Sequence, residues 1–195
     1  TKPEKSNSNP ITTDISTIKG QNERISKSIT YKTVSFEDTT LIDYSQFIDF
    51  QEFLKNTYPL VFEKLSLEIV SNYSLLLKWE GKNSALLPGI LMAHQDVVPV
   101  SDDTKDLWTH PPFEGLIIDG VLFGRGAIDD KINLMAQLES VDFLLKNGFQ
   151  PERDIYLVFG HDEEIGGKEG AVKIAQLLQS RGIKAEFVLD EGGFV

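Results

Sequence analysis

Three adjacent acidic residues, Asp162, Glu163 and Glu164, are the most unusual chemical feature of the sequence. They directly follow an apolar stretch at residues 155–159. The chain carries 30 acidic against 19 basic side chains, a net charge of −11, and adjacent like charges repel one another unless a cation neutralises them. A turn requires polar residues, but not three like charges. We therefore expect a positive partner here, and a divalent metal ion fits the residue types.

Histidine and carboxylate side chains form three further groups at comparable positions in the chain. These groups are His94 with Asp96, Asp129 with Asp130, and Asp190 with Glu191. Two of them follow short apolar stretches, and the third precedes a predicted helix. Imidazole nitrogen and carboxylate oxygen bind Zn²⁺ at about 2.0 to 2.2 Å. The residue types therefore favour a hard or borderline divalent ion.

The apolar stretches predict buried strands, and the segments between them predict helices. Strands are expected at 65–70, 74–79, 89–93, 120–124, 154–160 and 185–190, and helices at 45–55, 130–146 and 169–182. The stretches 89–93 and 155–159 are apolar throughout, which is typical of strands covered on both faces. Strands that alternate with helices predict an α/β fold with a largely parallel central sheet flanked by helices.

The predicted sheet brings the four groups of ligands to one edge. In open α/β sheets, ligands bind outside the carboxyl ends of the strands, and the groups at His94, at 161–164 and at Asp190 each follow a strand. Each group also has an ordinary explanation. An aspartate before a helix can cap it, three acids can form a solvated loop, and Asp190 can belong to a turn. The joint position of all four groups favours a metal site over these separate explanations.

The composition restricts the remaining classes of function. An acidic chain is a poor partner for nucleic acid, because phosphate binding needs a basic face. The absence of cysteine excludes disulfides, a thiol nucleophile and cysteine-ligated zinc. No apolar stretch approaches the roughly 18 to 20 residues that span a membrane. The first residue is Thr1, which leaves an export signal or membrane anchor ahead of it open and the localisation unassigned.

Five motifs resemble, in order and approximate spacing, those of the two-zinc exopeptidases and deacylases. They are MAHQDVVPV, WTHPPFEG, GRGAIDDK, GHDEEIGG and VLDEGG. This family includes carboxypeptidase S, glutamate carboxypeptidase, aminoacylase and acetylornithine deacetylase, and the first and fourth motifs are most similar to the carboxypeptidase S branch. The resemblance implies that residues 25–195 are the N-terminal part of a catalytic domain. The resemblance also implies that the lid or dimerisation domain and the C-terminal part are absent. The polar composition of residues 1–24 predicts a flexible arm ahead of the catalytic domain.

The resemblance also implies a role for each metal ligand. His94 and Asp190 would bind a first zinc ion, Glu164 would bind a second, and Asp129 would bridge the two. A cis peptide bond between Asp129 and Asp130 belongs to the same pattern. Two Zn²⁺ per full-length chain are implied, and Co²⁺ or Mn²⁺ stays open as the native metal.

Two further carboxylates receive catalytic roles from the resemblance. Asp96 would hold the His94 ring and set its tautomer. Glu163 would act as general base for a water molecule that attacks an amide carbonyl. The residues alone do not tell which of the adjacent Glu163 and Glu164 is the base and which is the ligand. The other two histidines, His110 and His161, are expected to shape a loop and to pack.

The implied function is metal-dependent hydrolysis of an amide bond in a peptide or N-acyl amino acid with a free carboxylate. The second zinc ion of this family needs one more histidine than the three in this chain supply, so we expect the chain alone to be inactive or nearly so. A homodimer through the absent lid domain is also implied. Two alternatives stay open: a deacylase of a biosynthetic N-acyl intermediate, and a non-catalytic binding protein on the same scaffold.

Overall fold

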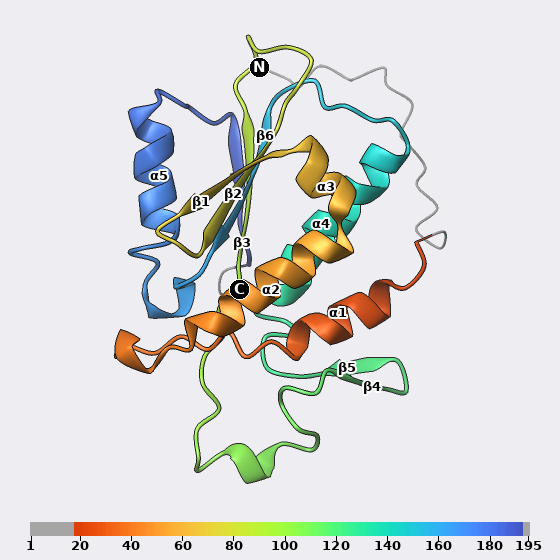
Figure 1. Cartoon of the computed structure of the whole chain (residues 1–195), viewed down its shortest axis with the longest axis vertical. Helices are drawn as coiled ribbons and strands as arrows, with labels where there is room; N and C mark the ends of the chain where they lie inside the picture. Colours follow the sequence, from red (N-terminus) through yellow and green to blue (C-terminus); the bar gives the residue numbers. More distant parts are fainter. Residues whose placement is uncertain (1–17, 193–195) are drawn as a thin grey trace.

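The computed structural model describes residues 18–192, in which a mixed five-stranded sheet lies between helices (Figure 1). The helices are α1 (Gln21–Ile29), α2 (Tyr44–Thr57), α3 (Pro59–Lys64), α4 (Lys131–Lys146) and α5 (Ala171–Ser180). The strands are β1 (Ser66–Val70), β2 (Ser74–Trp79), β3 (Gly89–His94), β4 (Leu116–Ile118), β5 (Val121–Phe123), β6 (Ile155–Gly160) and β7 (Phe187–Leu189). The short 3₁₀ helices of residues 18–192 are η2 (Thr39–Leu41), η3 (Lys105–Leu107) and η4 (Glu163–Ile165). The α/β fold expected from the sequence is confirmed.

The strand directions correct one expectation. The order in the sheet is β1-β2-β6-β3-β7, with β6, β3 and β7 parallel and β1 and β2 antiparallel to their neighbours. The sheet is therefore mixed rather than largely parallel. The physical reason is the length of the connections. A tight turn through Ser71 and Asn72 joins β1 to β2, and such a turn connects only antiparallel strands, whereas the parallel neighbours β3 and β6 are joined by a long crossover that contains α4.

The strand expected at 120–124 forms as β5, but it lies outside the main sheet. It pairs with β4 in a separate two-stranded hairpin. The turn between them uses Asp119 at φ 52° and Gly120 at φ 80°. Two central residues with positive φ are typical of the tight hairpin turns that an Asp-Gly pair favours.

Both faces of the main sheet are covered by apolar helix faces, with α5 on one side and α2, α3 and α4 on the other (Figure 1). The helical spacing of Phe47, Phe50 and Leu54 predicts one buried face for α2, and all three side chains are fully buried. Across the sheet, Ile174 and Leu178 of α5 are also buried. Each such side chain contributes about 1.5 to 3 kcal/mol by leaving water.

Helix α1 begins at Gln21, so the predicted end of the polar arm at residue 24 falls inside a helix. The rest of that arm, residues 1–17, lies outside the described residues. Arg24 of α1 forms an ion pair with Glu139 of α4, and the Tyr58 hydroxyl donates to the same carboxylate at 2.9 Å. These contacts fix a polar helix that the apolar pattern does not predict.

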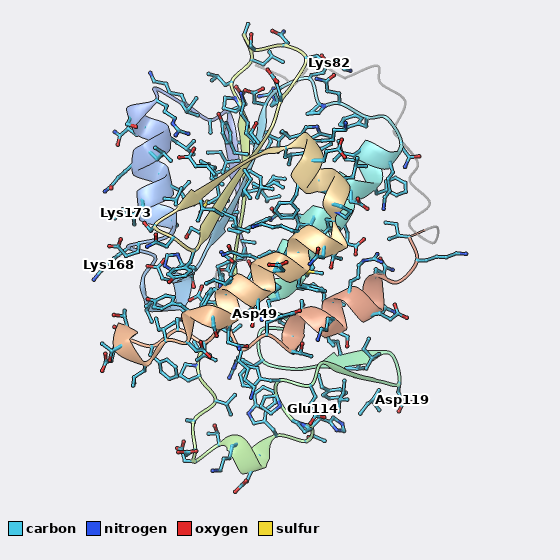
Figure 2. All side chains as sticks on the ribbon, in the orientation of Figure 1. Asp49, Lys82, Glu114, Asp119, Lys168 and Lys173 are labelled. Carbon is cyan, nitrogen blue, oxygen red and sulfur yellow. The ribbon has the colours of Figure 1, made fainter. Side chains whose placement is uncertain are left out.

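The surface carries the charge that the composition requires. The side chains of Asp49, Lys82, Glu114, Asp119, Lys168 and Lys173 lie on the outside of the molecule (Figure 2). None of the helices in residues 18–192 combines the length and the apolar character needed to cross a membrane.

Candidate metal centre

The carboxyl ends of the parallel strands β3, β6 and β7 and the start of α4 meet at His94, the last residue of β3. Its Nε2 atom lies 2.9 Å from Asp129 Oδ1, 3.8 Å from Glu163 Oε2 and 3.5 Å from Glu191 Oε1. Ligand atoms of His94, Asp129 and Glu164 lie within 4.8 Å of one another, and so do those of His94, Glu163 and Glu191. We call Asp129, Glu163, Glu164 and Glu191 the acidic cluster. The predicted convergence of the four groups at one edge of the sheet is confirmed.

The charge of the acidic cluster is only partly balanced. Within residues 18–192, every ion pair made by these four carboxylates is with His94, and no side-chain nitrogen of lysine or arginine lies within 4 Å of their oxygen atoms. Burial raises the pKa of both Glu163 and Glu164 above the usual value. Burial and the nearby carboxylates also raise the pKa of Glu191 to about 7. Hard oxygen donors that repel one another around one imidazole nitrogen match a divalent cation.

The fully buried Asp96 carboxylate lies behind His94. Its Oδ1 is 3.2 Å from His94 Nδ1, and the same ring nitrogen is 3.0 Å from the Asp96 carbonyl oxygen. Burial lowers the pKa of His94, but the hydrogen bond and charge of Asp96, together with the charges of Asp130 and Glu191, outweigh burial and raise that pKa to about 10. At this pKa both ring nitrogens of His94 carry protons near neutral pH in the metal-free chain. The Nδ1–H faces Asp96, so Nε2, which faces the acidic cluster, is the atom that would give up its proton to bind a metal ion.

The Asp96 carboxylate also holds the turn that carries both glutamates. Its Oδ1 accepts from the Glu163 backbone N–H at 3.0 Å, and its Oδ2 accepts from the Glu164 N–H at 3.1 Å. The turn closes at Gly166 and Gly167, whose positive φ values of 97° and 64° suit glycine. The sequence therefore folds into a tight loop directly after β6, and one buried carboxylate fixes it.

Between His94 and Asp96, Gln95 points into the protein and anchors the loop after β3. Its side-chain amide donates to the Tyr73 and Phe159 carbonyl oxygens at 2.8 and 2.9 Å, and its oxygen accepts from Gln51 of α2 at 3.0 Å. Alternate residues of an extended chain face opposite sides, so the buried Gln95 leaves its two neighbours facing the site.

The two adjacent glutamates occupy different sides of the cluster. Glu164 groups with Asp129, and its Oε1 accepts from the Val98 N–H at 3.2 Å. Glu163 groups with Glu191 instead. The sequence leaves the choice between base and ligand open, and this arrangement distinguishes their surroundings.

Asp190 is a predicted ligand that the structure does not bring into either group; its neighbour Glu191 takes that position. The Asp190 carboxylate accepts from the Glu191 N–H at 3.0 Å, and both residues line a cavity of about 240 Å³ with His94 and Glu163. The sequence places Glu191 in one of the candidate groups, but the resemblance assigns the ligand role to Asp190 alone. The available signal for Glu191 was its place in the acidic pair after a strand, where only one of two adjacent side chains faces a given side. The assignment of Asp190 stays a prediction.

Asp129 and Asp130 point in different directions. The peptide bond between them is cis, as the resemblance implies. Asp129 is exposed and faces His94, whereas Asp130 is fully buried and accepts from the His94 backbone N–H at 3.2 Å. Burial raises the pKa of Asp130 to about 6. Asp130 stands at the N-cap position of α4, but its side chain makes no capping hydrogen bond there.

The remaining histidines lie outside the two groups of ligand atoms. His161 is buried, and its Nδ1 lies 2.6 Å from Ser74 Oγ. His110 packs edge-on against Phe123, with ring centroids 4.5 Å apart. The packing and hydrogen bonding expected of His161 are confirmed.

Comparison with known proteins agrees with this geometry. The model of Peptidase family M20/M25/M40 matches residues 90–194, more than half of the chain. The chain belongs to this family. The resemblance drawn from the five motifs is thereby confirmed, and the family is one of metallo-carboxypeptidases and related hydrolases.

Two curated relatives of this M20 chain show the branch of the family. "Probable carboxypeptidase S-like 2" of Dictyostelium discoideum is 47% identical over 173 residues, which cover 87% of this chain and 33% of that protein. "N-fatty-acyl-amino acid synthase/hydrolase PM20D1" of Bos taurus is 41% identical over 175 residues, which cover 89% and 34%. The M20 chain therefore spans about a third of the length of the curated relatives it matches.

A solved structure shares the fold. The M20 family metallo-carboxypeptidase Sso-CP2 of Sulfolobus solfataricus superimposes with a TM-score of 0.67 at 23% identity, over 91% of the M20 chain and 38% of that protein. At this identity the likeness concerns the fold alone.

Proposed function

We propose that this chain supplies part of the catalytic domain of a metal-dependent amide hydrolase. The observation that carries the proposal is the position of His94. Its Nε2 faces carboxylates from three separate segments, and no lysine or arginine of residues 18–192 balances them. A surface turn needs no such arrangement, whereas a divalent cation does.

The residues that would hold the metal are His94, Asp129, Glu164 and Asp190. The proposed metal is zinc, because imidazole with carboxylates is a zinc donor set, and Co²⁺ or Mn²⁺ would suit the same donors. Bound ions would supply Lewis acidity toward a carbonyl oxygen and lower the pKa of a water molecule. Membership in a metallopeptidase family supports this proposal.

Glu163 is proposed as the general base. Its backbone is fixed by Asp96, while its side chain stays half exposed and 3.8 Å from His94 Nε2. A carboxylate whose pKa is raised by burial can both accept a proton and return it to the leaving nitrogen. Asp96 would act through His94 and through the two glutamate backbones rather than on the substrate.

The proposed substrate is a peptide or an N-acyl amino acid with a free carboxylate. The names of the relatives support this class, since one refers to carboxypeptidases and the other to N-fatty-acyl amino acids. Both names concern an amide bond beside an amino acid. The proposed reaction is therefore hydrolysis of that amide.

Replacing Glu163 with Gln tests the proposal in the natural-length polypeptide that carries this sequence. The variant keeps the size of the side chain but removes the base. We expect turnover of an N-acyl amino acid to fall at least about 100-fold, with the metal content unchanged. Unchanged turnover would contradict the role of Glu163. A protein that binds metal and such ligands but hydrolyses none of them would instead be a binding protein.

A further inference from the structure

A short segment near the N-terminus is part of the candidate metal centre. Residues 33–35, which we call the strap, lie alongside residues 95–97 below the carboxyl ends of β3 and β6, in the connection between α1 and α2 (Figure 1). Val34 and Val97 form a parallel bridge, with Ser35 N donating to Val97 O at 3.1 Å and Val97 N donating to Thr33 O at 3.0 Å. The strap precedes the region matched by the family model, residues 90–194.

The strap supplies one hydrogen bond directly to Asp96. Ser35 Oγ donates to Asp96 Oδ2 at 2.7 Å, and both residues are buried. An ionised carboxylate has about four acceptor positions. The other three contacts of Asp96 come from His94 Nδ1 and the backbone N–H groups of Glu163 and Glu164. With the Ser35 hydroxyl, each oxygen of the carboxylate has two partners.

The four contacts restrict how the Asp96 carboxylate can rotate. The torsion that turns a carboxyl group is soft, with broad preferences, so its orientation depends on its hydrogen bonds. Ser35 is the one side-chain donor to Asp96 Oδ2 among the described residues. Without Ser35, Asp96 Oδ2 loses one of its two partners, and the carboxylate can rotate. The His94 ring and the backbone of Glu163 and Glu164, which bind to this carboxylate, are then held less firmly.

We propose that Ser35 is a positioning residue of the metal centre, fixing Asp96 and through it His94, Glu163 and Glu164. The inference rests on the proposed function, because it assigns Ser35 to the site described there. A second contact ties the same N-terminal region to the other ligand loop. Lys131, two residues after Asp129, donates from Nζ to the carbonyl oxygens of Ser28 and Tyr31 at 3.0 and 2.6 Å. The backbone carbonyls of Ser28 and Tyr31 thus brace the loop of Asp129, in which the Ser28 hydroxyl takes no part, and the strap braces the loop of Asp96.

The test compares Ser35→Ala with Ser35→Thr and with Ser28→Ala. Ser28 is the matched control, because it is equally buried and its hydroxyl donates one hydrogen bond, to the Ile25 carbonyl oxygen at 2.6 Å. The readouts are Zn²⁺ affinity by competition with a chromophoric chelator, the absorption spectrum of bound Co²⁺, and unfolding of the metal-free chain in denaturant.

We expect Ser35→Ala to weaken Zn²⁺ binding about tenfold, the lower end of the effect seen when a residue behind a metal ligand is lost, and to alter the Co²⁺ spectrum. Ser35→Thr keeps the hydroxyl and should restore both. Ser28→Ala should lower stability without either change. Wild-type affinity and spectrum in Ser35→Ala would overturn the proposal, and so would an equal loss of affinity in Ser28→Ala. If Ser35→Ala does not fold, Ser35→Cys, a weaker donor of similar size, takes its place.

A measurement without metal separates this proposal from the proposed function. If the wild-type chain binds neither ion, the function fails, but the His94 ring N–H remains observable by NMR in the metal-free chain. We expect a slowly exchanging Nδ1–H signal that exchanges faster in Ser35→Ala and is unchanged in Ser28→Ala. Identical exchange in Ser35→Ala and wild type would overturn the positioning role.

Discussion

His94 Nε2 and Asp129 Oδ1 lie 2.9 Å apart although 35 positions separate the two residues in the chain. One residue ends β3, and the other precedes α4 by two positions. Their contact brings a strand end and a helix start to one point, and Glu163 and Glu191 come to the same imidazole nitrogen from two further segments. The predictions below concern the groups that hold this arrangement and the metal it is proposed to bind.

Asp96→Asn should destabilise the fold and weaken metal binding together. The substitution preserves shape, but it removes the negative charge and turns one acceptor into a donor facing donors such as the Glu164 N–H. A buried donor left without a partner costs about 1 to 3 kcal/mol. Denaturant unfolding of the metal-free chain measures the loss of stability, and chelator competition measures the loss of affinity. Wild-type values in both assays would contradict the central place given to Asp96.

Lys131→Met should lower the free energy of unfolding by about 1 to 3 kcal/mol. The fully buried lysine donates to two backbone carbonyl oxygens, and its Nζ lies 4.8 Å from the centre of the Phe50 ring. Methionine fills similar space but leaves both carbonyl groups without that donor. Lys173→Met, at an exposed position of α5, is the control and should change stability by no more than about 0.5 kcal/mol. Equal effects of the two substitutions would contradict the stabilising role given to the contacts of Lys131 with Ser28 and Tyr31.

Gly126→Ala should cost more stability than Gly148→Ala, although both glycines have similar φ values of 79° and 72°. A Cβ at Gly126 would lie 2.4 Å from Val97 Cγ1, whereas a Cβ at Gly148 would meet nothing within 4 Å. Both substitutions place a Cβ on a residue with left-handed backbone angles, which costs about 1 to 2 kcal/mol. Only Gly126→Ala also adds a steric clash, with Val97 in the loop after β3. Thermal unfolding of the two variants measures the difference in stability. Equal losses of stability would contradict the close approach of Gly126 to Val97.

The chain of residues 1–195 alone should show no measurable hydrolysis of N-acyl amino acids. On the proposed assignment, a second ion would find only Asp129 and Glu164 in the acidic cluster, which are too few protein ligands for a stable zinc site. An assay of the purified chain with excess Zn²⁺ checks this expectation. Robust turnover that Glu163→Gln abolishes would show that the described residues already form a working centre.

Local patterns in the sequence predict much of this fold. The buried face of α2 follows from the spacing of Phe47, Phe50 and Leu54, because a helix repeats over a few residues. The apolar runs at 89–93 and 155–159 predict the positions of β3 and β6, which end at His94 and just before His161. Those strand ends, with the rule that ligands bind at the carboxyl edge, also predict most of the acidic cluster.

What the sequence does not predict depends on distant contacts. The antiparallel pairing of β2 with β6 and the separate hairpin of β5 depend on partners that no local pattern names. Helix α1 was missed because its polar residues are stabilised by contacts such as that between Arg24 and Glu139. The contact between Ser35 and Asp96 joins residues 61 positions apart. The choice between Asp190 and Glu191 depends on which of two adjacent side chains after β7 faces His94.

Metal content per chain tests the central claim most directly. Elemental analysis would follow purification without chelators and dialysis against Zn²⁺, for residues 1–195 and for the natural-length polypeptide, each beside its His94→Ala variant. We predict about one or two Zn²⁺ per chain, with strongly reduced zinc in both variants. No zinc in either wild-type protein, or the same zinc content in wild type and His94→Ala, would contradict the account.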